Sequence, residues 1–182
     1  MLEISPSGGN VPALDWSHLP HSVETLDGYW TKLSEMKLIE LEKLTDTANG
    51  KKVLKVTLDG EPNDDGSRME IIINCGQHAR EWSAVQTCPY LVHHWLSDKQ
   101  KIKGFKIYMV PLMNPDGYEY SVTKDRMWRK NRQQVDNNNE ELGKFVIFDF
   151  CSFLTKILFV GAKFNRVGSK VNVMINEVIN PK

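Results

Sequence analysis

The feature of this sequence that most restricts its fold is the order of three segments between residues 67 and 111. Residues 67–74 (SRMEIIIN) and 105–111 (FKIYMVP) are short, apolar and rich in β-branched and aromatic residues, as buried strands are. Residues 81–97 between them have helical spacing, with Pro89 expected to kink the helix or to mark where it restarts. A helix that joins two buried strands usually makes a crossover within one sheet. The order therefore predicts an α/β fold.

Three more elements precede this crossover. Thr25 is a suitable N-cap for an amphipathic helix that runs to about Lys37. Its predicted apolar face consists of Leu26, Tyr29, Leu33 and Met36. Residues 38–44 and 52–59 have the composition of strands and are bounded by turn-rich segments. The simplest arrangement of these two strands with residues 67–74 is a meander.

The use of aromatic residues changes abruptly near residue 133. All five tryptophans, all five tyrosines and all five histidines lie before this point, whereas six of the seven phenylalanines lie after it. We therefore expect an amino-terminal segment (residues 1–21), a main domain (22–132) and a divergent tail of unknown role (133–182). Such a tail suggests a truncated or alternatively spliced product. Its apolar residues 145–160 are too few and too often interrupted by charge to span a membrane.

Composition excludes several classes of protein. The 23 basic and 23 acidic residues cancel, so no net field attracts nucleic acid or an anionic membrane. The three cysteines, Cys75, Cys88 and Cys151, are too few and uneven for a disulfide-stapled secreted scaffold. The first residues do not form a signal peptide, so we expect either an intracellular protein or a true start further upstream.

A histidine and a glutamate stand three residues apart where the strand at 67–74 ends. The sequence NCGQHAREW (residues 74–82) contains His78 and Glu81, and open α/β sheets bind their ligands at the carboxyl ends of strands. Zinc prefers imidazole nitrogen and carboxylate oxygen, and a catalytic zinc site has three protein ligands and one open position. The alternative is structural: Glu81 closes a capping box at the start of the helix, and His78 merely lies near the cap.

A second informative stretch, MVPLMNPDGYEYSVTKDRMWRKNR, covers residues 109–132. Its NPDG has the composition of a turn, and five cations and a tryptophan follow it. The structural interpretation is a turn followed by a solvated basic segment. We do not expect a nucleic-acid surface, because the basic segment is isolated and the chain is neutral.

Taken together, GQHAREW and NPDGYEY…RMWRK resemble the motifs of zinc metallocarboxypeptidases of the pancreatic carboxypeptidase A and B type, in the same order. The resemblance covers about residues 22–132. It implies a partial mixed-sheet metallocarboxypeptidase fold, with helices packed on the sheet, that represents the amino-terminal portion of the family. It also implies one Zn²⁺ ion as cofactor and a peptide or protein with a free carboxyl terminus as substrate.

The resemblance also assigns roles to individual residues. His78 and Glu81 match two of the three zinc ligands. Arg80 and Arg126 match arginines that bind the substrate. Arg129 matches the arginine that polarises the scissile carbonyl and stabilises the oxyanion, a task suited to a permanently charged guanidinium. The turn at residues 114–117 would deliver this segment to the site.

The family's third zinc histidine, its general-base glutamate and its substrate-capping tyrosine belong to a later part that is not recognisable here. No histidine follows His94. His93 and His94 lie too far along the predicted helix, because twelve helical residues span about 18 Å. His18 and His21 are expected at the surface.

One weak match falls in the tail. Residues 135–140 read VDNNNE, so Asn138 coincides with the asparagine of the family's carboxylate-binding Asn-Arg pair. Asn139 stands where the arginine belongs, and an amide cannot replace a charge-assisted hydrogen bond.

We therefore predict a zinc metallocarboxypeptidase by descent that hydrolyses the carboxyl-terminal peptide bond through a zinc-bound water. We do not predict that this chain is catalytically competent, because its third zinc ligand and its general-base glutamate are not identifiable. The alternatives are a non-catalytic relative that binds carboxyl-terminal peptides, and a structural fragment in which His78 and Glu81 only cap a helix. Family analogy predicts an extracellular or secreted protein, although no signal peptide is present.

Overall fold

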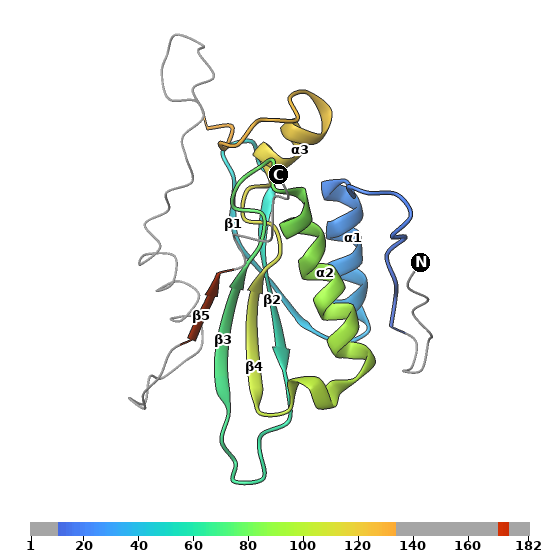
Figure 1. Cartoon of the computed structure of the whole chain (residues 1–182), viewed down its shortest axis with the longest axis vertical. Coiled ribbons are helices and arrows are strands. Elements are labelled where there is room, and N and C mark those ends of the chain that lie inside the picture. Colours follow the sequence, from blue (N-terminus) through green and yellow to red (C-terminus); the bar gives the residue numbers. More distant parts are fainter. Residues whose placement is uncertain (1–10, 134–170, 175–182) are drawn as a thin grey trace, which may run out of the picture.

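The computed structural model describes residues 11–133 and 171–174, and within them a mixed sheet carries two helices packed side by side (Figure 1). The helices are α1 (Val23–Glu35) and α2 (Trp82–Ser97), and a short helix, α3 (Pro115–Thr123), lies beyond one end of the sheet. The sheet has the order β1-β2-β4-β3-β5. Its strands are β1 (Glu40–Asp46), β2 (Lys52–Asp59), β3 (Met69–Asn74), β4 (Phe105–Val110) and β5 (Val171–Met174). The predicted α/β class is confirmed.

The crossover is present, but the meander is wrong. Strands β3 and β4 are parallel neighbours joined by α2, whereas β2 pairs with β4 instead of β3. The segment between β2 and β3 does not form a hairpin because β4 occupies the position between them. Gly60 permits this arrangement: its N–H donates to Phe105 O at 3.0 Å, and a Cβ there would lie 1.9 Å from Ile102 O.

Helix α1 begins and ends at residues other than those predicted. Its N-cap is Ser22, whose Oγ accepts from Thr25 N at 3.2 Å. At the other end Lys37 has a φ of 57°, and the N–H groups of Lys37 and Leu38 donate to Ser34 O and Leu33 O. These two bonds make a Schellman motif, which stops the helix before the apolar pattern lapses. Met36 therefore caps the helix and is 40% exposed instead of joining the buried face.

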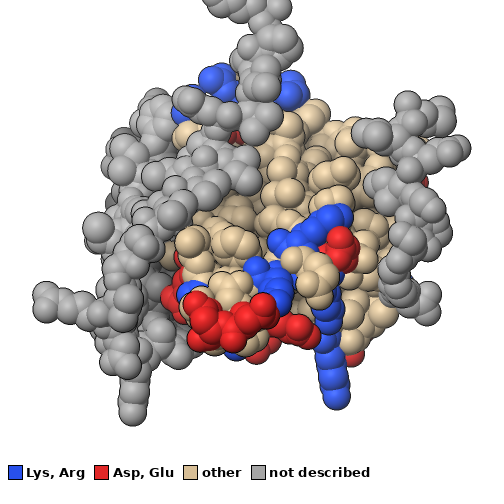
Figure 2. Space-filling model, turned by 60° about the horizontal axis from the view of Figure 1, so that its bottom comes forward, with Lys and Arg blue, Asp and Glu red and all other residues tan. Residues whose placement is uncertain are grey.

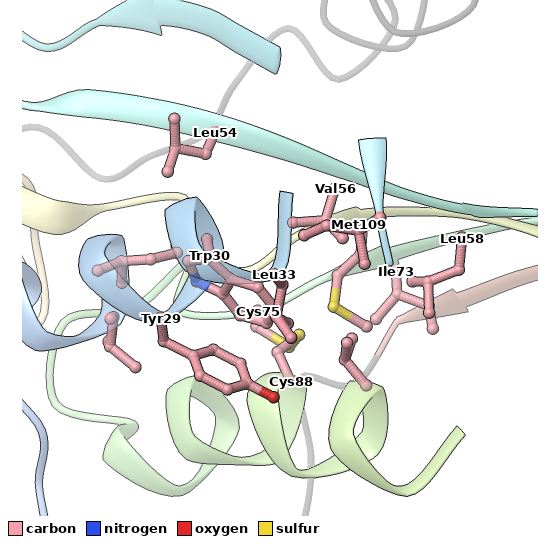
Figure 3. Packing of buried hydrophobic residues seen from close by; sticks show 14 of the residues in the cluster. Tyr29, Trp30, Leu33, Leu54, Val56, Leu58, Ile73, Cys75, Cys88 and Met109 are labelled. Atoms are coloured by element: carbon pink, nitrogen blue, oxygen red, sulfur yellow. A yellow bond between two sulfur atoms is a disulfide. The ribbon is translucent and has the colours of Figure 1, made fainter. Parts of the chain in front are cut away.

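The core lies between the two helices and the sheet (Figure 3). Trp30 and Leu33 of α1 pack against Val56 of β2 and Met109 of β4, and all four are at most 1% exposed. Helix α2 is continuous across Pro89, so no second helix starts there.

A disulfide crosses this core. Cys75, directly after β3, is bonded to Cys88 of α2, and both residues are fully buried (Figure 3). The sequence interpretation did not pair these cysteines, because it weighed only their number and not the crossover that places α2 over the end of β3.

The end of the sheet remote from α3 carries mixed charge, and Figure 2 shows acidic and basic side chains close together on this face. Asp64 pairs with Lys103 at 2.6 Å, and Asp59 pairs with both Lys106 and Arg68. Among the described residues, no helix is long and apolar enough to cross a bilayer. The predictions for residues 145–160 and for Asn138 lie outside the described part of the chain.

Candidate functional site

The site lies at the carboxyl ends of β3 and β4. Beyond the strands the two chain segments stay joined: Cys75 N donates to Val110 O, Met113 N to Cys75 O, and Asn114 N to Gly76 O, at 2.9 to 3.1 Å. Gly76 has a φ of 63°, and a Cβ there would meet Leu112 and Val85 side chains at 2.7 and 2.8 Å. A glycine is required for this close packing.

His78, Glu81 and Arg129 form one hydrogen-bonded cluster. His78 Nδ1 lies 2.9 Å from Glu81 Oε1, and Arg129 Nη2 lies 3.1 Å from His78 Nε2. Arg129 Nη2 also lies 3.4 Å from His78 Nδ1, so the guanidinium, which can only donate, faces the imidazole ring rather than one nitrogen of it. The side chains of His78 and Glu81 are 20% and 28% exposed, so the pair remains open to solvent. The sequence-predicted ligand pair and the predicted catalytic arginine are therefore in contact.

The capping alternative is not what the described structure contains. Glu81 is itself the N-cap of α2, and its side chain makes no capping hydrogen bond. Its carboxylate instead points to His78. The structure therefore leaves the His78–Glu81 pair without the local structural role that the sequence allowed.

The other two predicted arginines adjoin this cluster through Trp82. Arg126 Nη1 donates to Arg80 O at 2.9 Å, and the Arg126 guanidinium lies 3.7 Å from the centre of the Trp82 ring. Such stacking is a favourable cation–π geometry. Trp82 is held in turn by its Nε1–H, which donates to Ser121 Oγ at 2.8 Å.

Residues 114–117 are not a turn but the start of α3. Asn114 is the N-cap, its Oδ1 accepts from Gly117 N at 3.0 Å, and Pro115 occupies the first turn. The Asn114 amide also donates to Lys130 O at 3.1 Å, while Ala79 N donates to Arg129 O. The predicted delivery of the arginine segment therefore depends on a buried asparagine. The sequence feature that could have predicted this helix start is an asparagine directly before a proline, the usual order at the beginning of a helix.

His21 is not at the surface, contrary to the prediction. It is 6% exposed, its Nδ1 lies 2.5 Å from Gln86 Oε1, and its Nε2 lies 3.0 Å from Asp15 O. Tyr118 completes this buried network: its hydroxyl donates to His21 O at 2.7 Å and accepts from Gln86 Nε2 at 2.9 Å. Burial raises the pKa of the Tyr118 phenol, so it keeps its proton.

The remaining histidines are also engaged away from the cluster. His18 pairs with Asp15 at 2.8 Å and is highly exposed, His93 contacts Pro12 O, and His94 stacks on Tyr90. Residues 11–133 and 171–174 contain no group of three histidine, cysteine or acidic side chains placed to bind one metal ion. The donor chemistry of His78 and Glu81 suits zinc, but these two residues alone do not complete a catalytic zinc site.

One hydrogen-bond donor of the Arg129 guanidinium is unpaired among the described residues. Its Nε is buried and has no hydrogen-bond partner within the described part of the chain. A buried donor without a partner costs free energy unless a ligand supplies an acceptor. The Arg129 side chain as a whole is half-buried and lies beside His78, where its guanidinium can donate to an oxygen-bearing ligand.

The structure thus combines an α/β sheet, a His-x-x-Glu pair at the carboxyl edge of its parallel strands and arginines beside that pair, at the edge where open α/β sheets bind ligands. The chain belongs to the zinc carboxypeptidase family, whose model matches residues 27–167.

Relatives and solved structures agree with this assignment. The chain is 36% identical over 113 residues to "Inactive metallocarboxypeptidase ecm14" of Schizosaccharomyces pombe, covering 56% of this chain and 23% of that protein. It is 41% identical over 81 residues to "Mast cell carboxypeptidase A" of Rattus norvegicus, covering 40% of this chain and 20% of that protein. Bovine thrombin-activatable fibrinolysis inhibitor, solved with tick carboxypeptidase inhibitor, superposes with a TM-score of 0.57 at 27% identity, covering 66% of this chain and 40% of that one. The chain thus spans less than a quarter of the length of these two sequence relatives.

Proposed function

We propose that this chain carries a carboxypeptidase-type site that binds the carboxyl-terminal end of peptides without hydrolysing them by itself. The observation that supports this most directly is the contact between Arg129 and His78, which joins two segments 51 residues apart. In this proposal the half-buried guanidinium of Arg129 donates to a peptide carbonyl or carboxylate oxygen. Arg80 and Arg126 contact the rest of the peptide end.

His78 and Glu81 would hold Zn²⁺ weakly in this proposal, as an incomplete ligand pair. A fully ligated zinc ion in this family supplies Lewis acidity toward water and a carbonyl oxygen. We derive no such step for this chain, because the described residues offer two ligands only. A relative named as an inactive metallocarboxypeptidase also favours binding over turnover.

Hydrolysis of the carboxyl-terminal peptide bond is the second candidate function. It is favoured by the family match and by the open His78–Glu81 pair. It requires a third ligand and a general base from residues outside the described part of the chain. A histidine there is impossible, because no histidine follows His94 and none precedes His18.

Measurements of peptide affinity and of peptide hydrolysis distinguish the two candidate functions. We expect a blocked peptide with a free carboxyl end to bind at least about tenfold more tightly than its amide, because a charge-assisted bond to arginine is lost in the amide. Arg129→Met should remove this preference, whereas Arg68→Met, an arginine at the remote end of the sheet, should not. Equal binding of acid and amide would overturn the proposal, and release of the terminal residue by the wild-type chain would establish the hydrolytic function.

Zinc content is measured on the same proteins. We expect zinc to be lost on dialysis from the wild-type chain, and still more readily from the His78→Ala, Glu81→Ala double variant. The matched control is His18→Ala, which removes an exposed histidine remote in sequence from the pair. One zinc ion per chain that survives dialysis, and that only the double variant loses, would show that a third ligand exists.

We also propose that the protein folds in an oxidising, secretory-type compartment. The Cys75–Cys88 disulfide supports this, since such bonds are rare in reducing compartments. Alkylation of the protein from its native source, followed by mass measurement, should modify one cysteine of three without reduction. Modification of all three would contradict the proposal.

A further inference from the structure

An apolar pocket lies beside the site, between α2 and the chain segment that precedes α1. Its volume is about 410 Å³, which is within the range of ligand pockets. Trp16, Leu19 and Pro20 form one wall, in a segment that contacts α2 through Pro12 with His93 and Trp16 with Tyr90. The residues that matter for its chemistry are Trp16, Leu19, Trp82, Gln86, Thr87 and Tyr90.

Three residues that line this pocket, Gln86, Trp82 and Thr87, have their polar side-chain atoms bonded elsewhere, and Ser83 and Tyr90 add one hydroxyl each to the lining. Both polar atoms of the Gln86 amide are used, by His21 and by Tyr118. The Trp82 Nε1–H donates to Ser121, and the Thr87 hydroxyl donates to Ser83 O at 2.8 Å. The pocket therefore offers an incoming group mainly hydrocarbon and aromatic surface, which suits an apolar side chain.

The pocket has an aromatic wall and is exposed to solvent. The Trp16 ring meets the Tyr90 ring edge-on at 5.8 Å, so these two rings support each other. Leu19 and Tyr90 are nevertheless 54% and 42% exposed. Large apolar side chains left open around a concave site indicate a binding surface, because covering them is favourable.

Trp82 connects this pocket to the arginines. Trp82 lines the pocket, and the guanidinium of Arg126 stacks on its ring. The same guanidinium donates a hydrogen bond to Arg80 O. Arg126 is exposed, so its positive charge lies at the rim of an apolar hollow. The complementary ligand has a bulky apolar group next to a negative one.

We propose that this pocket binds a bulky apolar side chain, such as leucine or tryptophan, that lies upstream of the free carboxyl end of a bound peptide. Arg126 contacts an acidic side chain beside it. The occupant is thus an extended peptide segment that combines an apolar with an acidic residue. This inference rests on the proposed function for the position of the carboxyl end and adds an upstream specificity to it.

The test uses the full 182-residue chain and labelled peptides that share one carboxyl-terminal residue. Leucine, tryptophan or serine is placed at each upstream position in turn, beside aspartate or asparagine, and Kd is measured by fluorescence anisotropy with free-acid and amide forms. Thr87→Trp fills the pocket, Leu19→Ala removes part of its wall, and Met36→Ala removes an exposed apolar side chain that is not in the pocket lining.

We expect one upstream position at which the leucine or tryptophan peptide binds at least about tenfold more tightly than the serine peptide. Thr87→Trp should abolish this ratio, Leu19→Ala should reduce it, and Met36→Ala should leave it unchanged. Asparagine in place of aspartate should weaken binding, and Arg126→Met should remove that difference.

Two results separate this inference from the proposed function. If free acids bind better than amides but leucine and serine are equivalent at every position, the pocket inference is wrong and the proposed function stands. If acids and amides bind equally while Thr87→Trp abolishes a preference for leucine, the pocket binds peptides and the proposed function is wrong. A preference for leucine that survives both pocket variants would overturn the inference.

Discussion

Asn114 shows how much of the site depends on a single buried amide. Its Oδ1 caps α3 through Gly117 N, and its Nδ2 donates to Lys130 O, one residue from Arg129. Asn114 is only 3% exposed, so neither bond is readily replaced by water. One side chain therefore fixes both the start of α3 and the backbone that presents Arg129.

We expect Asn114→Ala to lower the free energy of unfolding by about 2 kcal/mol, because it removes a helix cap and leaves a buried carbonyl without its donor. Urea denaturation would measure this. The matched control is Asn131→Ala, whose Oδ1 accepts from Gln133 N near the surface, and it should cost a few tenths of a kcal/mol at most. Equal effects of the two substitutions would contradict the role given to Asn114.

At the scale of elements, the Cys75–Cys88 disulfide ties the end of β3 to α2. His78 and Glu81 both lie inside the loop that it closes. A covalent link limits how far the strand end and the helix can separate in the unfolded chain, which is the main way such links stabilise. The donor pair is thus held between two ends of a closed loop.

The Cys75→Ala, Cys88→Ala double variant should be less stable by about 3 kcal/mol, since the bridged residues are 13 apart. Denaturant midpoints of the oxidised proteins measure the difference. Cys151→Ala, which leaves this disulfide intact, serves as the control. A double variant as stable as that control would show that the disulfide contributes nothing to folding.

The crossover was the most predictable part of the fold, because residues 67–74 and 105–111 carry their strand character in local sequence. Strand order was not predictable in the same way. Whether β2 pairs with β3 or with β4 depends on contacts between distant residues, and turn composition at 60–66 favours neither. His21 was misplaced for the same reason, since its burial comes from packing against α2.

The functional site shows the same difference between features set by local sequence and features set by contacts between distant residues. His78, Glu81 and Arg129 could be selected from their motifs, and the predicted roles of all five site residues stay predictions. Arg129 is brought to His78 by tertiary hydrogen bonds, from Ala79 N to Arg129 O and from the Asn114 amide to Lys130 O. Trp82 and Ser121 could not be assigned from spacing, because their connection is a tertiary hydrogen bond.

At the scale of the whole molecule, the sheet has a short outer strand, β5, that pairs with β3 in parallel. Ile71 to Asn74 match Val171 to Met174 in this pairing. Without β5, β3 would be an edge among the described strands, and exposed apolar edges recruit other chains. The tail therefore has a structural contribution that its sequence alone did not reveal.

We expect Val173→Pro to increase self-association, because proline has no N–H to contribute to the β3–β5 pairing and its ring restricts the extended backbone there. Light scattering at rising protein concentration would detect the change. Val173→Ala keeps the backbone N–H and should remain close to wild type. A proline variant as monodisperse as the alanine variant would show that the β3 edge does not need this cover.

The strand order β1-β2-β4-β3-β5 also dictates a sequence of events on the ribosome. Strands β1 and β2 are consecutive and can pair as soon as both have emerged. The apolar β3 then emerges with no partner, because its neighbours β4 and β5 are still to be synthesised. At the usual rate of about 5–20 residues per second, β3 waits seconds for β4. Nascent chains halted before β4 should therefore bind chaperones more strongly than chains halted after it.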